Sequence, residues 1–116
     1  MRPRRRTLEL NSCVARARVD FLRVAGVVSA STGVPVAEIV KRQGSGRPYR
    51  WRSDPVSFAR LATTYLTVTA CNVRQGTLAR TIERHRCRIL FDVRFVEDAR
   101  EDPATDKLLE RMEAML

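Results

Sequence analysis

The segment 78–90 holds the residues of this chain whose types and spacing best suit them to bind another molecule. Its sequence, LARTIERHRCRIL, contains four arginines and the only histidine of the chain, and Glu83 is its only acid. The pattern predicts a helix, a tight turn and a second helix that begins with a cluster of cations, which is the layout of a helix-turn-helix. In that motif the start of the second helix faces base edges, so we expect Arg84, Arg86 and Arg88 to contact DNA.

Two further residues of the segment, His85 and Cys87, join the predicted DNA contacts. His85 either reads a base edge or is a surface histidine near the start of a helix. Cys87 is better explained as a small, half-buried residue than as a reactive thiol, because nothing nearby resembles a catalytic base or an orienting carboxylate. The two supply too few metal ligands, among arginines that repel cations, so we expect no metal site.

A second basic segment, residues 41–53, has the composition of a loop. It contains two glycines, a proline, five cations and two aromatic residues. Because contacts that position a protein on DNA commonly come from basic loops, we expect its arginines to clamp phosphates. Tyr49 and Trp51 either stack on sugar or base, or pack over the helices of the domain itself. The predicted phosphate contacts in this loop are Arg42, Arg47, Arg50 and Arg52.

The composition of the whole chain favours a nucleic-acid partner. Its 116 residues are enough for one small domain, and 22 Lys and Arg against 13 Asp and Glu give a formal net charge of +9. Nearly all of the positive charge is arginine, whose planar fork of donors suits phosphates and guanine edges. Charge alone also permits an acidic protein or a membrane surface as the partner. From Glu97 onward the chain is acidic, which indicates that the last helix points away from the basic surface.

Several classes of protein are disfavoured. The three cysteines are odd in number and widely spaced, which argues against a disulfide framework and fits a reducing cytoplasm. No apolar run is long enough to span a membrane, and the basic start of the chain lacks the apolar stretch of a secretory signal. The sequence has no paired carboxylates, no nucleophile beside a base and no phosphate-binding loop. We therefore expect no enzyme, no cofactor and no small-molecule substrate.

The spacing of apolar residues predicts an all-α domain of about six helices. The first helix is expected to run from a cap at residues 11–12 to a stop signal at 32–33. Residues 1–11 are then a disordered basic arm, and residues 12–116 are the domain. A short helix is expected to open at Pro35.

Later helix starts are marked by capping residues. Asp54 and Asp102 are each followed by a proline, which places an N-cap before proline at the first helical position. Asn72 is predicted to cap the helix between them, with Gln75 three residues on as in a capping box.

Two stretches argue against an all-helical chain. Residues 64–70 are rich in β-branched side chains, and residues 88–96 nearly alternate polar and apolar. Propensity and period alone would make both of them strands. Ile89, Val93 and Val96 also keep helical spacing, so the local pattern of the second stretch leaves helix and strand open.

Four short pieces of the chain share their order and spacing with one family. They are GVPVAEIV at 33–40, FARLATTYL at 58–66, LARTIER at 78–84 and VEDAREDP at 96–103. The second is close to Ala-Arg-Gln-x-Ala-Met-Tyr-Leu, the third to Leu-Ala-Arg-x-Leu-Gly-Arg and the fourth to Val-Glu-Asp-x-Arg-Asp-Asp-Pro. On these motifs the chain from about residue 21 onward resembles the C-terminal DNA-binding domain of the bacterial replication initiator DnaA. It is most similar to stand-alone alphaproteobacterial relatives of that domain.

The resemblance implies a single helix-turn-helix domain of the DnaA C-terminal, Trp-repressor-like type, in which the family counterpart of Arg60 lies near the DNA. The family signature of the recognition helix is Asp-His-Thr-Thr-Val, or Asp-Arg-Thr-Thr-Val in relatives. Residues 85–89 here are His-Arg-Cys-Arg-Ile, and only Arg86 matches the variant form. Glu83 replaces the glycine of the turn, so it must take the turn conformation at a cost or reshape the turn. The fold therefore carries over, whereas the sequence specificity of the initiator does not.

We thus predict binding of double-stranded DNA in the cytoplasm, at the nucleoid, by a regulator of chromosome replication or transcription. One alternative is a degenerate copy of the initiator domain that binds a replication-regulatory protein and no longer reads DNA. The replaced signature supports that alternative, and the surplus of arginine opposes it. A second alternative is an RNA-binding or nucleoprotein component that uses the same charge. The predicted DNA contacts together are Arg42, Arg47, Arg50, Arg52, Arg60, Arg84, His85, Arg86, Cys87 and Arg88.

Overall fold

The protein folds into a single all-α domain, as the sequence predicts. The computed structural model describes residues 5–41 and 54–116, with the backbone alone for residues 5–11. These ranges contain helices and no strand, and no helix among them is long and apolar enough to cross a membrane. The six helices are α1 (Arg5–Thr32), α2 (Val36–Val40), α3 (Pro55–Thr69), α4 (Gln75–Thr81), α5 (Arg86–Ala99) and α6 (Pro103–Ala114).

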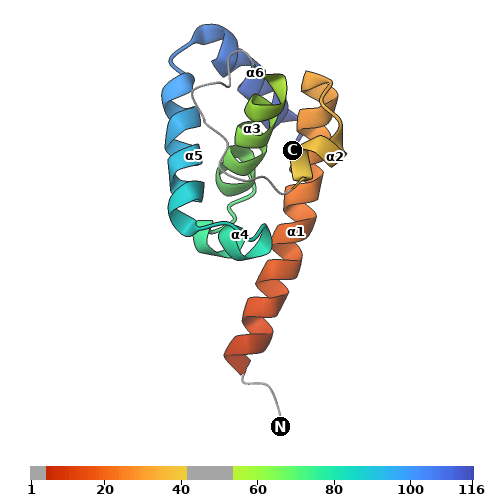
Figure 1. The fold of residues 1–116 in the computed structure, drawn as a ribbon, viewed down its shortest axis with the longest axis vertical. Coiled ribbons are helices and arrows are strands. Elements are labelled where there is room, and N and C mark those ends of the chain that lie inside the picture. Colours follow the sequence, from red (N-terminus) through yellow and green to blue (C-terminus); the bar gives the residue numbers. More distant parts are fainter. Residues whose placement is uncertain (1–4, 42–53) are drawn as a thin grey trace.

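The body of the domain is formed by α1, α3 and α5 (Figure 1). Helix α3 lies between the other two, and α4 lies across the lower end, where it contacts both α1 and α5. Helix α6 packs on α1 at the opposite end of the molecule. The N-terminal end of α1 extends beyond the rest of the domain. The first turn of α5 is therefore far from the acidic C-terminal segment.

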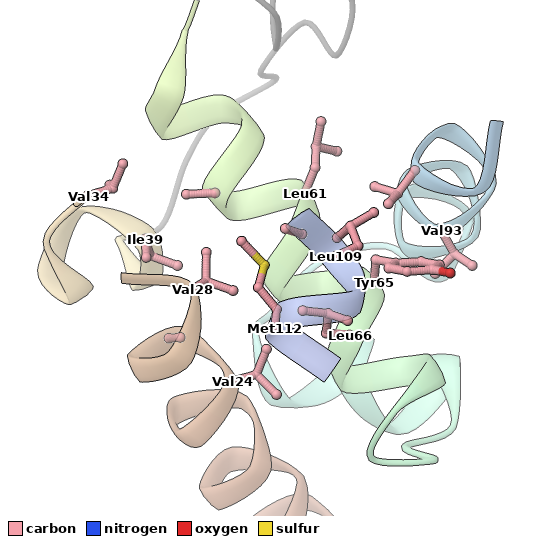
Figure 2. Packing of buried hydrophobic residues seen from close by; sticks show 14 residues of the cluster. Val24, Val28, Val34, Ile39, Leu61, Tyr65, Leu66, Val93, Leu109 and Met112 are labelled. Atoms are coloured by element: carbon pink, nitrogen blue, oxygen red, sulfur yellow. The ribbon is translucent and has the colours of Figure 1, made fainter. Parts of the chain in front are cut away.

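The main hydrophobic core lies where α1, α3 and α6 meet (Figure 2). Val24 and Val28 of α1, Leu66 of α3, and Leu109 and Met112 of α6 are all fully buried there. Burying a side chain of this size stabilises the fold by roughly 1.5–3 kcal/mol. A second, smaller cluster holds α4 against α1 and the start of α5; it consists of Ala17, Val73, Leu78, Ala79 and Ile89.

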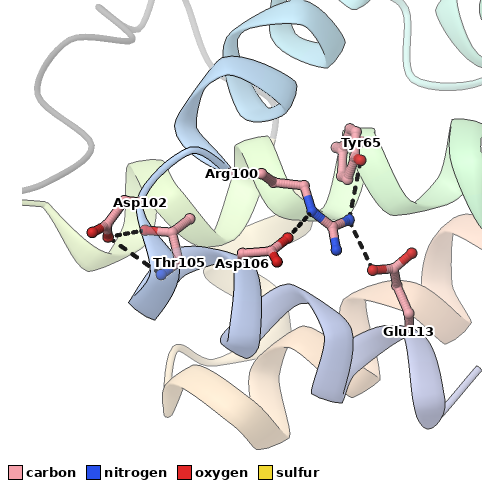
Figure 3. Close-up of polar contacts among 6 residues, drawn as sticks. All are labelled: Tyr65, Arg100, Asp102, Thr105, Asp106 and Glu113. Carbon is pink, nitrogen blue, oxygen red and sulfur yellow. Dashed lines mark hydrogen bonds and ion pairs between the residues drawn. The ribbon is translucent and has the colours of Figure 1, made fainter.

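Arg100, at the end of α5, joins three helices (Figure 3). Its Nε donates a hydrogen bond to Asp106 Oδ1 at 2.6 Å, and its NH1 lies 2.8 Å from Glu113 Oε1, both on α6. The same NH1 lies 3.2 Å from the Tyr65 hydroxyl of α3. Burial lowers the pKa of Arg100, but the bonds to Asp106, Tyr65 and Glu113 outweigh it, and the net pKa is raised. Arg100 therefore stays charged and ties α6 to the body of the domain.

The caps of α3 and α6 are those that the sequence predicts. Asp54 accepts from the backbone N–H of Val56 at 3.1 Å and from the Ser57 hydroxyl at 2.7 Å. Asp102 accepts from the N–H and the hydroxyl of Thr105, at 3.3 and 2.8 Å. Each carboxylate satisfies amide hydrogens that a helix start leaves without an intrahelical acceptor.

The two stretches with strand-like patterns are both helical. The β-branched residues of α3 fit because their hydroxyls bond back to the helix: Thr63 to the Ala59 carbonyl and Thr67 to the Thr63 carbonyl, each at 2.7 Å. In α5, Ile89, Val93 and Val96 are buried on one face. The helical spacing of the apolar residues therefore prevails over the alternation, since it is the helix that brings all three into the core.

Two predicted helix starts were wrong. Helix α1 begins at Arg5, not at residues 11–12, so residues 5–11 of the expected arm are helical. Its residues 1–4 lie outside the described residues. Asn72 does not cap α4, because it has a φ of 55° and lies before Arg74, which occupies the N-cap position without a side-chain bond. A left-handed residue bends the chain between α3 and α4, and asparagine tolerates that conformation better than most residues.

Candidate nucleic-acid interface

Helices α4 and α5 are joined by a tight turn at the place where the sequence predicts the turn of a helix-turn-helix. The Ile82 N–H bonds to the Leu78 carbonyl at 3.0 Å, and the Arg84 N–H bonds to the Ala79 carbonyl at 2.8 Å, which closes α4. Between them Glu83 takes a left-handed conformation with a φ of 54°. Of the two outcomes expected for this residue, the structure shows the first: Glu83 adopts the turn conformation that glycine adopts without strain.

His85 forms the N-cap of α5. Its Nδ1 accepts a hydrogen bond from the Cys87 backbone N–H at 3.1 Å. An accepting Nδ1 requires the ring proton to be on Nε2, so the exposed imidazole presents a donor to the outside. The cap also orients the ring, because its inner nitrogen is fixed to the helix.

The first turn of α5 is exposed. His85, Arg86 and Cys87 are all exposed to solvent, and they lie where the helix leaves the turn beside α4. The amide hydrogens of this turn point out of the helix end and give it a positive partial charge. Arg86 adds a full cation there. Together these groups form a surface suited to phosphates and to acceptor groups on base edges.

Arg88 is held against its own helix. Its side chain is 29 % exposed, and its Nε lies 3.2 Å from Asp92 Oδ1, one helical turn further on. Its guanidinium carbon also lies 6.0 Å from the centre of the Phe91 ring, within cation–π range. The DNA contact of Arg88 stays a prediction; unlike the exposed Arg86, Arg88 is partly buried and is contacted by Asp92 and by the Phe91 ring.

Asp92 is the residue of this region that the sequence analysis missed. Only 2 % of it is exposed, on the face of α5 that also buries Ile89, Val93 and Val96. Burial raises the pKa of the Asp92 carboxyl, and the charges of Arg88 and Arg84 only partly oppose it. One signal was present in the sequence: Asp92 is the only acid between Glu83 and Glu97, and it falls on the apolar face of the helix.

Arg84 lies at the inner side of the same group. It is partly buried, and burial lowers its pKa, with further lowering by the charges of Arg88 and Arg60 and an opposing effect of Asp92. Arg84, Arg88 and Asp92 are called the arginine cluster below. The cluster brings two cations from the turn and α5 together around one buried carboxylate.

Arg60, predicted near the DNA, is largely engaged within the protein. Its side chain is 11 % exposed, its Nε donates to the Glu38 carbonyl at 2.8 Å, and its NH2 lies 3.9 Å from the Glu38 carboxylate. Arg60 thus joins α3 to α2. Its NH1 is buried and has no hydrogen-bond partner among the described residues. The predicted loop contacts Arg42, Arg47, Arg50 and Arg52 lie outside the described residues.

An open depression with a volume of about 380 Å³ lies between α1 and the turn that joins α4 to α5. Helix α1 forms one side of it, and Leu22, 49 % exposed, is among the apolar residues there. Glu83 of the turn forms part of the other side. The lining residues are Arg18, Phe21, Leu22, Val40, Thr81, Ile82 and Glu83.

Comparison of this chain with known proteins found no relative. No protein-family model matches this chain, and searches of curated proteins and of solved structures found no significant match. The resemblance to the initiator domain therefore remains a prediction from sequence motifs.

Proposed function

We propose that this protein binds double-stranded DNA through α4 and α5 and acts as a regulator of chromosome replication or transcription. The observation that carries the proposal is the exposed start of α5, where Arg86 and the Nε2–H of His85 stand at a helix N-terminus. A helix end of this kind fits a DNA groove, because its donors match phosphate oxygens and the acceptors of guanine.

The distribution of charge supports the same proposal. The acidic residues that follow Glu97 belong to the end of α5, to the connection between α5 and α6, and to α6 itself. This part lies at the opposite end of the molecule from the first turn of α5 (Figure 1). A duplex at α4 and α5 would thus meet the basic part of the chain without repulsion from the acidic part.

Salt dependence of duplex binding tests the proposal. About five to eight phosphate contacts from the basic loop and the start of α5 would give a log–log slope of affinity against salt of roughly −4 to −7. The measurement uses a random-sequence duplex at several salt concentrations, followed by selection of preferred sites from a random pool. A slope near zero, or no duplex binding at low salt, would exclude DNA as the main partner.

The depression beside α1 favours a second candidate, a module that binds a regulatory protein instead of DNA. Its lining combines one exposed and several partly buried apolar side chains with Arg18 and Glu83, a mixture typical of protein contacts. Substitutions in the arginine surface distinguish DNA binding from binding of a regulatory protein. If Arg86→Ala leaves duplex binding unchanged but releases a captured protein, the arginine surface serves a protein and the second candidate replaces the first.

A further inference from the structure

The arginine cluster contains a group whose presence fold stability does not explain. A carboxylate as buried as Asp92 loses most of its hydration, and burial is the largest influence on its pKa. Its Oδ1 lies 3.2 Å from Arg88 Nε, yet in a direction that makes no hydrogen bond, and no other described residue donates to that atom. Buried ion pairs of imperfect geometry repay little of their desolvation cost. Asp92 therefore does not serve chiefly to stabilise α5.

The order of the pair along the helix leads to the same conclusion. Arg88 precedes Asp92 by one turn, and in a helix an acid placed before a base is the more favourable order. What the pair does achieve is geometric. Asp92 holds the guanidinium from the inner side, and the ring of Phe91, itself 50 % exposed, supports it from the outer side at 6.0 Å. A long side chain that would otherwise sample many rotamers thus has one direction imposed on it.

We propose that Asp92 is a positioning residue of the DNA-binding surface: it holds Arg88 at the side of the first turn of α5, where the guanidinium grips a backbone phosphate beside the groove that Arg86 enters. This inference rests on the proposed function and adds a division of roles to it. Arg86, exposed and at the helix start, reads base edges. Arg88, fixed in advance, binds phosphate without losing its side-chain freedom at the moment of binding.

The test compares substitutions that make the same change in net charge. Asp92→Asn and Asp98→Asn each remove one negative charge from α5, but Asp98 is exposed. If charge alone mattered, both variants would bind duplex DNA slightly more tightly than the wild type. Because Asp92 acts through Arg88, we expect Asp92→Asn to bind about tenfold more weakly, within the coupling range of contacting residues. Asp98→Asn should bind at least as tightly as the wild type.

A second variant shows whether the effect passes through Arg88. Arg88→Lys keeps the charge but lacks the planar fork, so it should itself weaken binding, and adding Asp92→Asn to it should have little further effect. The Nε–Hε resonance of Arg88 in NMR spectra is a readout independent of DNA. It should be distinct in the wild type and should move to the averaged position of free arginines in Asp92→Asn. The thermal midpoint of unfolding is measured as well, because a merely structural role of Asp92 would lower that midpoint in Asp92→Asn.

Three outcomes would overturn the inference: Asp92→Asn binds like Asp98→Asn, the Asp92→Asn penalty is the same with Lys at position 88, or Arg88→Lys binds like the wild type. The last of these does not depend on whether Asp92→Asn folds. Failure of the proposed function gives a different result, since the wild type itself would then bind no duplex at low salt.

Discussion

At the residue scale, the two arginines in the first turn of α5 differ in exposure and in their contacts. Arg86 is exposed, whereas Arg88 is held by Asp92 and Phe91. Replacing Arg86 by Ala should cost about 1–3 kcal/mol on a preferred DNA site and flatten the preference among sequences, because a bidentate contact to a base edge is lost. Replacing Arg50 of the basic loop should weaken all duplexes alike, since a phosphate contact carries no sequence information. Competition binding with matched and scrambled duplexes measures both effects. Equal weakening of every sequence by both variants would mean that the protein binds DNA without reading it.

The buried carboxylate makes a second prediction at this scale, for stability against pH. The pKa of Asp92 is raised by burial, with Arg88 and Arg84 as the charges that face it, so the ionised form costs the folded state stability. The stability cost of ionising Asp92 is absent below the ordinary carboxyl pKa, and it grows as the pH rises through the raised pKa of the folded state. Asp92→Asn should therefore raise the free energy of unfolding by about 1 kcal/mol at pH 7, with the gain shrinking as the solution is acidified. Urea unfolding at pH 7 and near pH 4, with Asp98→Asn as the control, measures it; a gain independent of pH, or a loss at pH 7, would contradict it.

At the scale of elements, the turn between α4 and α5 contains strain at a single residue. Glu83 has a φ of 54°, a conformation that costs a residue with a Cβ roughly 1–2 kcal/mol and glycine much less. Glu83→Gly should raise the free energy of unfolding by about 0.5–1 kcal/mol. The substitution relieves the backbone strain, but part of that gain is offset because glycine gives the unfolded chain more conformational freedom. Glu83→Ala is the matched control, because it removes the same carboxylate and keeps the Cβ. Equal stability of the two variants in urea unfolding would show that the left-handed turn is not strained here.

At the scale of the whole molecule, Arg100 adds polar contacts to the apolar packing that holds α6 on the domain. Arg100 bonds to Asp106 and Glu113 of α6 and to Tyr65 of α3, and it also lies over the Tyr65 ring at 5.9 Å (Figure 3). Arg100→Ala should lower the free energy of unfolding by about 2 kcal/mol, because charged hydrogen bonds are lost and their partners remain partly buried. Arg94→Ala, an exposed arginine of the same helix, should change stability by less than about 0.5 kcal/mol. Duplex binding well below the melting temperature should be unaffected by Arg100→Ala, since Arg100 lies at the far end of α5 from Arg86. Similar stabilities of the two variants would show that Arg100 does not hold the helices together.

The order of residues was sufficient to predict an all-α domain, the end of α1 at Thr32, the caps at Asp54 and Asp102, and the turn before α5. These features depend on local chemistry, on short-range hydrogen bonds and on the 3.6-residue period, which the order of residues displays directly. Residues 88–96 were undecided locally, because their pattern suits a strand and a helix equally. Packing against α3 and α4 favours the helix, in which Ile89, Val93 and Val96 are all buried.

The differences among the arginines arise when the helices pack together. In the sequence Arg60, Arg84, Arg86 and Arg88 are equivalent cations, and their predicted roles were nearly the same. Folding places Arg60 against Glu38 of another helix and Arg88 against a buried carboxylate, while Arg86 stays exposed. The physical reason is that the exposure and charged neighbours of a side chain depend on residues distant in the sequence, or on which face of a helix is buried. Neither is visible until the helices are packed.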